Sequence, residues 1–405
     1  MADSYWTKRN LVSRRRFLHG AGMAGAGMAL AACGGTTTPA GGKVAGSPVA
    51  GSSKTPVAGD AKPVRGGLLT IGMASDVANL DPLNSTLFVD RLVQYQMYNS
   101  LLATDKDLKL LPGLALSWET ADPLSVVLKL RQGVKFHDGG DLNADAVKFN
   151  FDRMLTTPSS PRRTELTGVK SVQAIDPSTV KLVLDAPFSP LLAQLVDRAG
   201  MIVSPAAIQK YGAELTRAPL GAGTGPYKFV EYKKDDHINL IRNDAYWDKD
   251  AAGAALPYLD RLVYRPIVDN SQRLNSLRTG EIDFADGIPG KDVEAIKKDP
   301  TLSYSQAPSL GYQDIALHSG AEPFKDVRVR QALAWSIDRQ QVIDTILFKL
   351  AIQANGPVAP PHFAYDPAYK PYSRDIAKAK ALLQAAGRQT VNFTMMITAG
   401  SPEDQ

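Results

Sequence analysis

Residue types that could carry out chemistry are few and scattered along this chain of 405 residues. His137 and Asp138 are adjacent and could bind a metal ion, but glycines follow them directly, and we interpret the pair as a structural turn. The other histidines lack the spacing of a metal site. The chain contains neither a Gly-x-Ser-x-Gly nor a His-Glu-x-x-His pattern, the signatures of two hydrolase classes. We therefore predict no catalytic residues, no metal and no cofactor.

An export signal is predicted over residues 1–32. Arg14 and Arg15 lie in a twin-arginine pattern, and the weakly apolar run that follows is shorter than the ~20 residues that cross a bilayer. The run ends in Leu-Ala-Ala-Cys, which resembles the lipobox of bacterial lipoproteins and implies that Cys33 is lipidated. A dinucleotide-type glycine pattern at residues 20–25 is rejected because no strand precedes it. We expect a lipid-anchored protein in the periplasm or on the outer face of the cytoplasmic membrane.

The net charge of +5 is concentrated in this leader. Five of the 46 basic residues lie there with one acidic residue, so the rest of the chain has 41 basic and 40 acidic residues. This balance gives no argument for nucleic-acid binding. Residues 33–65 consist mostly of small residues and proline, and we predict a flexible linker because such a segment buries too little apolar area to become ordered. The single cysteine excludes an internal disulfide.

Strand and helix patterns alternate from residue 66 onward, which indicates an α/β fold. Strands are predicted at residues 68–73, 126–130, 134–136, 179–184, 227–230, 237–241 and 391–397. A helix is predicted over residues 87–102, with one face formed by Leu92, Tyr95, Asn99 and Leu102. Further helices are predicted after the capping residues Asn143, Asp269 or Asn270, Asp326 and Asp338, the last with Val342, Ile343, Ile346 and Leu347 facing inward, and one that ends at Gly387.

Seven sequence elements, in order, resemble family 5 of the extracellular solute-binding proteins, the peptide and nickel branch. They lie at residues 66–82, 114–119 (LALSWE), 130–147 (beginning LRQGVKFHDG), 223–227 (GTGPY), 243–247 (NDAYW), 280–283 (GEID) and 323–333 (PFKDVRVRQAL). The resemblance implies a two-lobed, type II periplasmic-binding-protein-like fold with a small inserted domain. It maps lobe I to residues 66–100 and 203–308, the insert to 101–202, and a partial lobe II to 309–405. Because family members continue further, we expect the second lobe to be incomplete at the C-terminus.

The resemblance also implies a ligand, such as a dipeptide or oligopeptide, held between two closing lobes for delivery to an ABC permease. It points to a set of eight ligand-contacting residues: Asn84, Ser85, Thr86, Leu87, Tyr227, Tyr312, Gln313 and Ile315. Oligosaccharide, opine and nickel-complex ligands remain open, as does a sensory binding protein without a permease. A secreted enzyme is the alternative from another class, and measurable turnover of a bound substrate would identify it. We expect a monomer.

Overall fold

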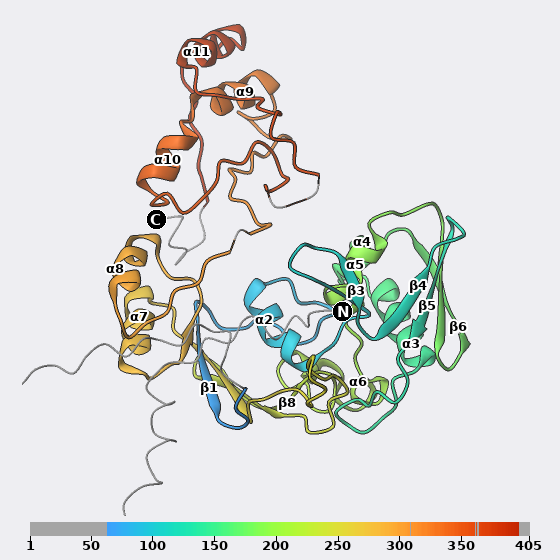
Figure 1. Ribbon diagram of the computed structural model, residues 1–405. Coiled ribbons are helices and arrows are strands. Elements are labelled where there is room, and N and C mark those ends of the chain that lie inside the picture. The colour runs from blue at the N-terminus through green and yellow to red at the C-terminus, as the bar shows by residue number, and fades with distance from the viewer. Residues whose placement is uncertain (1–62, 308, 361, 363, 397–405) are drawn as a thin grey trace, which may run out of the picture.

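The computed structural model describes residues 63–307, 309–360, 362 and 364–396 (Figure 1). The predicted leader with Arg14 and Arg15, the lipidation residue Cys33 and most of the linker lie outside the described residues. We refer below to residues 66–307 as the N-terminal body and to residues 309–396 as the C-terminal part.

A mixed five-stranded sheet forms one half of the N-terminal body, in the order β11-β1-β10-β9-β8. Strand β1 (Leu68–Met73) pairs in parallel with β10 (Arg261–Pro266) and with β11 (Phe284–Ala285), while β9 (His237–Arg242) runs antiparallel to β10 and to β8 (Tyr227–Lys233). The predicted strand at residues 68–73 and the predicted hairpin are therefore confirmed.

An antiparallel four-stranded sheet forms the other half, in the order β4-β5-β7-β6. Its strands are β4 (Ala115–Glu119), β5 (Ser125–Leu130), β6 (Val169–Asp176) and β7 (Thr179–Leu184), and a two-stranded ribbon, β2 (Leu102–Thr104) with β3 (Leu110–Pro112), lies beside them. Helix α3 (Ala144–Thr156) packs on β6 and β7. It begins as predicted, because the Asn143 side chain accepts a hydrogen bond from the amide of Ala146 at 2.9 Å.

Each sheet has its own apolar core. One cluster includes Phe151, Leu128 and Leu182 around the four-stranded sheet, and the other includes Met73, Ile238 and Leu240 around the five-stranded sheet. Leu83, from the segment before α2 (Phe88–Met97), packs in the first cluster, so this segment joins the two halves.

The remaining helices are short. Those of the N-terminal body are α4 (Arg162–Glu165), α5 (Leu191–Gln194), α6 (Pro205–Tyr211), α7 (Asn270–Thr279) and α8 (Val293–Lys298), with 3-10 turns η2 (Arg198–Gly200), η3 (Gly212–Thr216) and η4 (Gly290–Asp292). Helix α7 has the predicted limits: Asp269 caps it, and Gly280 ends it in the left-handed conformation at φ 75°.

The C-terminal part contains α9 (Val327–Ser336), α10 (Arg339–Thr345) and α11 (Ile376–Ala385); α10 follows α9 almost directly, and a long irregular segment leads from α10 to α11 (Figure 1). Asp326 and Asp338 cap α9 and α10 through their side chains, as predicted. Helices α9 and α11 pack against each other, and Lys378 lies over the ring of Trp335 at 3.8 Å from its centroid.

Several predicted elements were wrong. The helix expected over residues 87–102 ends at Met97, because the backbone becomes extended at Tyr98 and Leu102 enters β2. The buried face of this helix also differs from the predicted face and consists of Asp90, Val93, Gln94 and Met97. Residues 134–136 form no strand, because β5 pairs with β4 and β7 on its two edges. Residues 391–396 carry no strand, and of the four residues expected to face inward on α10 and just after it, only Ile343 is buried.

Candidate functional site

A buried ion pair precedes the segment predicted to line the ligand site, residues 84–87. Asp81, which precedes it, is buried and accepts hydrogen bonds from both terminal nitrogens of Arg153 on α3. The same carboxylate accepts the amide of Leu83 at 3.0 Å. Since the ion pair lies away from solvent, it holds the segment in one position, as a preformed binding surface requires.

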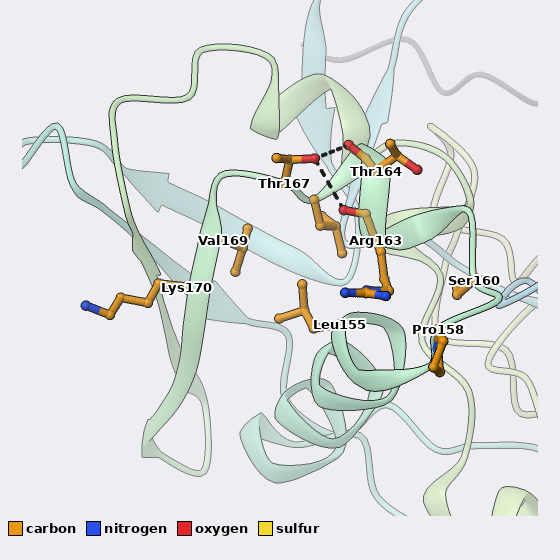
Figure 2. A pocket seen from close by; sticks show the side chains of 9 residues that line it. Leu155, Pro158, Ser160, Arg163, Thr164, Thr167, Val169 and Lys170 are labelled. Carbon is orange, nitrogen blue, oxygen red and sulfur yellow. Dashed lines mark hydrogen bonds between the residues drawn. The ribbon is translucent and has the colours of Figure 1, made fainter.

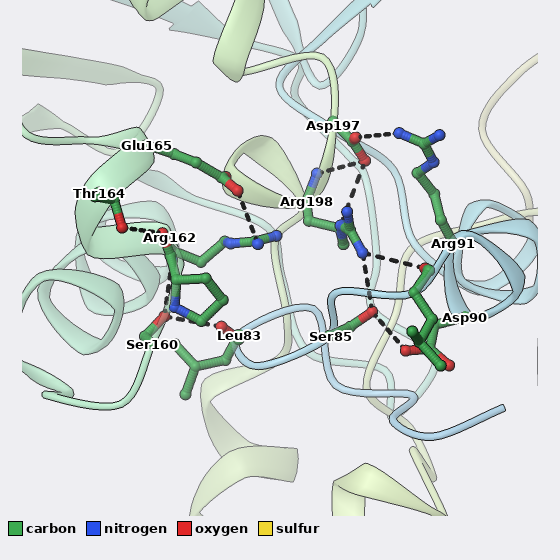
Figure 3. A network of polar contacts seen from close by, with 12 residues as sticks. Leu83, Ser85, Asp90, Arg91, Ser160, Arg162, Thr164, Glu165, Asp197 and Arg198 are labelled. Carbon is green, nitrogen blue, oxygen red and sulfur yellow. Dashed lines mark hydrogen bonds and ion pairs between the residues drawn. The ribbon is translucent and has the colours of Figure 1, made fainter. Parts of the chain in front are cut away.

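Ser85 is the centre of a polar network (Figure 3). Its hydroxyl is fully buried, donates to Asp90 Oδ2 at 3.0 Å and accepts from Arg198 Nη1 at 3.2 Å. Arg198 Nη1 also donates to the carbonyl of Leu87 at 3.3 Å. Asp90, on α2, in turn accepts the amides of Ala78 and Asn79 at 2.7 and 3.3 Å. The network therefore links α2, the predicted segment and η2.

Two guanidinium groups in this region, those of Arg162 and Arg198, have nitrogens without a hydrogen-bond partner among the described residues. Arg162 has only 2% of its surface exposed and pairs with Glu165 at 2.8 Å through one terminal nitrogen, while its Nε and Nη1 have no hydrogen-bond partner among the described residues. The Nε of Arg198 likewise has none, although Asp197 lies 3.9 Å away. In Figure 3 the Arg162 guanidinium points toward that of Arg198. Buried unpaired donors cost free energy, so this place is suited to an anionic group.

Burial shifts the ionisation of these groups. It lowers the pKa of Arg162, and the nearby Glu165 only partly offsets this effect. Burial also raises the pKa of Glu165 despite the attraction of Arg162. Both shifts follow from the cost of holding charge away from water, and an added anion close to Arg162 would favour its charged form.

The surface above this network is apolar. Leu87 and Phe88, at the start of α2, have 44% and 55% of their surface exposed, and Thr86 beside them is exposed too. Arg91 lies 5.3 Å from the centroid of the Phe88 ring and pairs with Asp197 at 2.7 Å. Two exposed apolar side chains, Leu87 and Phe88, thus adjoin the cationic Arg198, which donates to Ser85 and to the carbonyl of Leu87, and small-molecule sites combine apolar area with a few polar groups in this way.

The structure does not bring the other predicted residues to this surface. Tyr227 opens β8 and is buried in the core around the five-stranded sheet, where burial raises the pKa of its hydroxyl. Tyr312, Gln313 and Ile315 are exposed on an irregular segment of the C-terminal part. Sequence reasoning missed Arg162, Arg198 and Asp90; the only signal was a set of charged residues beside apolar ones, at Arg162-Arg163 and Asp197-Arg198.

A hollow of about 600 Å³ lies elsewhere, between α3, α4 and β6 (Figure 2). Leu155, Leu166 and Val169 form apolar lining, and Arg163 and Lys170 add positive charge. The hydroxyl groups of Thr164 and Thr167 already donate to carbonyls of the α4 region. The hollow therefore offers no hydroxyl donor that is not already used.

His137 connects the two halves of the N-terminal body. Its Nε2 lies 2.9 Å from the carbonyl of Gly225, and its amide donates to the carbonyl of Gly223 at 2.7 Å. Asp138 bonds to the Ser204 hydroxyl and the Gly140 amide. No group of His, Cys, Asp or Glu within the described residues is arranged to hold a metal ion. The bonds of His137 tie the turn at residues 137–140 to the glycine segment at residues 223–225.

The chain matches the model of the bacterial extracellular solute-binding proteins, family 5 (middle), over residues 109–405. The chain belongs to this family. It is 36% identical over 319 residues to the glutathione-binding protein GsiB of Pectobacterium atrosepticum, an alignment that covers 78% of this chain and 60% of that protein. The chain thus spans about 60% of the length of the curated relatives it matches.

Solved structures confirm the predicted two-lobed α/β fold. The periplasmic binding protein DppA of Helicobacter pylori, in complex with the peptide STSA, superposes with a TM-score of 0.72 at 29% identity, covering 80% of this chain and 67% of DppA. The binding protein AgaA, in complex with agropinic acid from A. tumefaciens R10, gives 0.70 at 30% identity, covering 79% and 64%. In the part of the chain that the structure describes, no helix has both the length and the apolarity for crossing a membrane.

Proposed function

We propose that this family member captures a peptide-class solute outside the cell and delivers it to an ABC importer without changing it chemically. The observation that carries the proposal is the pair of incompletely bonded guanidinium groups, the buried Arg162 and the partly buried Arg198, the second of which donates to the carbonyl of the exposed Leu87. A peptide offers a terminal carboxylate for these guanidinium groups and side chains for the exposed Leu87 and Phe88. The relatives named for glutathione and for a bound peptide support this class of ligand.

The proposed lobe boundaries remain those of the sequence: residues 66–100 and 203–308 for lobe I, 101–202 for the insert, and 309 onward for lobe II. In this arrangement residues 84–87 contribute the lobe I face, and Tyr312, Gln313 and Ile315 contribute the lobe II face. Tyr227, which is buried in the core around the five-stranded sheet, is not proposed to touch the ligand. Ligand favours the closed state since only that state contacts it from both lobes.

The test is isothermal titration of the full-length protein with glutathione, free tetrapeptides and their C-terminally amidated forms. The free peptides should bind with micromolar affinity, about 8 kcal/mol. The Arg198→Gln variant should lose about tenfold to a hundredfold in affinity for free peptides, and much less for amidated ones, since a charge-assisted hydrogen bond is lost. Arg163→Gln, which changes an exposed neighbour, is the matched control.

Equal binding of free and amidated peptides would show that the protein does not recognise the terminal carboxylate. Failure to bind any of the peptides would exclude the peptide class of ligand. An opine is then the next ligand to titrate, because the AgaA complex holds agropinic acid and such a molecule also carries carboxylate groups. Oligosaccharides and nickel complexes are titrated next in the same assay. A protein that binds ligand but stimulates no permease would be a sensory binding protein.

We also propose that the protein is exported through Arg14 and Arg15 and then anchored through lipid on Cys33, as a monomer. Cys33→Ala should release the protein from the membrane fraction, since the acyl chains are its anchor. The double variant Arg14→Lys with Arg15→Lys should keep the protein inside the cell. A membrane-bound Cys33→Ala protein would contradict the lipid anchor, and dimers in light scattering would contradict the monomer.

A further inference from the structure

A small contact between the N-terminal body and the C-terminal part lies away from the candidate ligand surface. Gly290, at the start of η4, faces the ring of Phe348 and the side chain of Leu350, which follow α10. A β-carbon on Gly290 would lie 3.0 Å from Phe348 Cδ2 and 3.2 Å from Leu350 Cδ1. The two parts therefore touch here through a glycine backbone and two apolar side chains. We name Gly290, Phe348 and Leu350 the rear contact.

The chain that presents Phe348 is conformationally strained. Phe348 and Lys349 are consecutive non-glycine residues with φ of 51° and 60°, a left-handed conformation that side chains disfavour. The turn is held by hydrogen bonds from the amides of Lys349 to Ile343 and of Leu350 to Leu347, both at 2.9 Å. Strain of this kind persists only where surrounding contacts compensate it. The rear contact supplies such compensation.

The rear contact belongs to an arrangement in which the candidate ligand surfaces are apart. Leu87 and Phe88 on one side, and Tyr312 and Ile315 on the other, each keep between 44% and 55% of their surface exposed. Figure 1 shows α8 and α10 close together on one side of the connecting segment, whose described residues are 299–307 and 309–311, and α2 on the other. A rotation about that segment that brings the C-terminal part toward α2 draws α10 away from α8.

We propose that the rear contact holds the ligand-free protein open and thereby sets its ligand affinity. Closure breaks the contact, so its free energy is subtracted from that gained when ligand is enclosed. Residues that never touch ligand would then determine how much of the protein is ready to close. This inference rests on the proposed function only in requiring that the two parts close on each other.

The experiment compares the full-length protein with Phe348→Ala by small-angle X-ray scattering without ligand and by titration with glutathione. Phe348→Ala should lower the radius of gyration of the ligand-free protein and tighten glutathione binding about threefold to tenfold, because more of the population is closed. Ile346→Ala is the matched control: it changes an apolar side chain with 53% exposure just before the turn that does not line this contact. It should leave both measurements at their wild-type values.

Gly290→Ala is a second variant that disrupts the rear contact, and it keeps the strained turn intact. Its added methyl crowds Phe348 and forces the rear contact apart, while the Gly290 backbone is not in the left-handed region. It should shift both measurements in the same direction, and adding it to Phe348→Ala should change little more. An unchanged radius of gyration in both variants would overturn the proposal. A reduced radius without glutathione binding would leave it standing and count against the proposed ligand class instead.

Discussion

The N-terminal body and the C-terminal part differ sharply in how they bury their apolar residues. The body has two extensive cores, one for each sheet. The described residues of the C-terminal part bury only six apolar residues, namely Phe324, Val329, Ala332, Ile343, Ala359 and Ala379, and leave others such as Val342 and Ile346 largely exposed. Burial of apolar area is the main favourable term in folding, so the body holds its half of the candidate site rigidly, whereas the C-terminal half rests on few contacts.

Charged groups show the same difference. In the body, Asp81 and Arg153 form an ion pair with 3% and 19% of the side chains exposed. In the C-terminal part, Arg328 pairs with Asp326 and Arg388 with Glu322, with at least one side chain of each pair more than a third exposed. Exposed pairs contribute little because water screens them. The polar framework that could orient a ligand is therefore concentrated in the body.

The largest expected effect comes from the core of the four-stranded sheet. Phe151→Ala removes a fully buried ring from α3 and should lower the free energy of unfolding by about 4 kcal/mol, through lost burial and the cavity left behind. Phe393→Ala, in the C-terminal part, removes a ring with 45% exposure that contacts Phe324 and should cost about 1 kcal/mol. Urea denaturation measures both. Equal losses would erase the distinction between the two regions.

The next effect concerns the buried ion pair. Asp81→Asn leaves the Arg153 guanidinium without its carboxylate and should cost about 3 kcal/mol of stability. Asp152→Asn is the matched control, since Asp152 pairs with Lys148 on the surface of α3 with both side chains more than 40% exposed, and it should cost less than about 0.5 kcal/mol. A cost for Asp81→Asn near that of the control would show that the segment at residues 84–87 is not held by this pair.

His137 makes the stability of the body depend on pH. Burial lowers the pKa of His137 from 6.5 to about 4, and the hydrogen bond to Gly225 opposes only part of this shift. The unfolded chain thus takes up a proton below pH 6.5 that the folded chain refuses until about pH 4. Stability should fall by roughly 2–3 kcal/mol as pH drops through this window. His137→Gln should flatten that part of the curve in denaturation series at each pH, and an unchanged slope would contradict the assignment.

The sequence predicted local features of the fold in both regions and missed those that depend on distant partners. Strand β1, helix α7 and the caps Asn143, Asp326, Asp338 and Asp269 were predicted correctly, because alternation and capping are local properties of the chain. The end of α2 was missed because Leu101 and Leu102 bond to the backbone of Gly200 and Leu195, about a hundred residues later. No local pattern carries such a partner.

The candidate site could be predicted only where one segment forms it. Residues 84–87 were predicted from the family resemblance. Thr86 and Leu87 among them are exposed, whereas Ser85 is buried in the polar network. Arg162 and Arg198 come from α4 and η2. Arg198 donates to Ser85, more than a hundred residues earlier in the sequence, and Ser160, two residues before Arg162, donates to the carbonyl of Leu83. The roles of Arg162 and Arg198 depend on burial and on missing partners, neither of which composition or spacing encodes.

The smallest expected effect tests whether the two regions unfold as one unit. Asn143→Ala and Asp375→Ala each remove a side chain that accepts an amide at 2.9 Å, on α3 and on α11, and each should cost about 1 kcal/mol locally. On α3 the loss should appear in the global unfolding free energy, since α3 packs in a core. On α11 it should appear as faster amide hydrogen exchange within that helix, while the urea midpoint of the body stays constant. A lowered midpoint in Asp375→Ala would mean that the C-terminal part is coupled to the body more tightly than its few buried residues indicate, and that ligand surfaces on both sides are equally preformed.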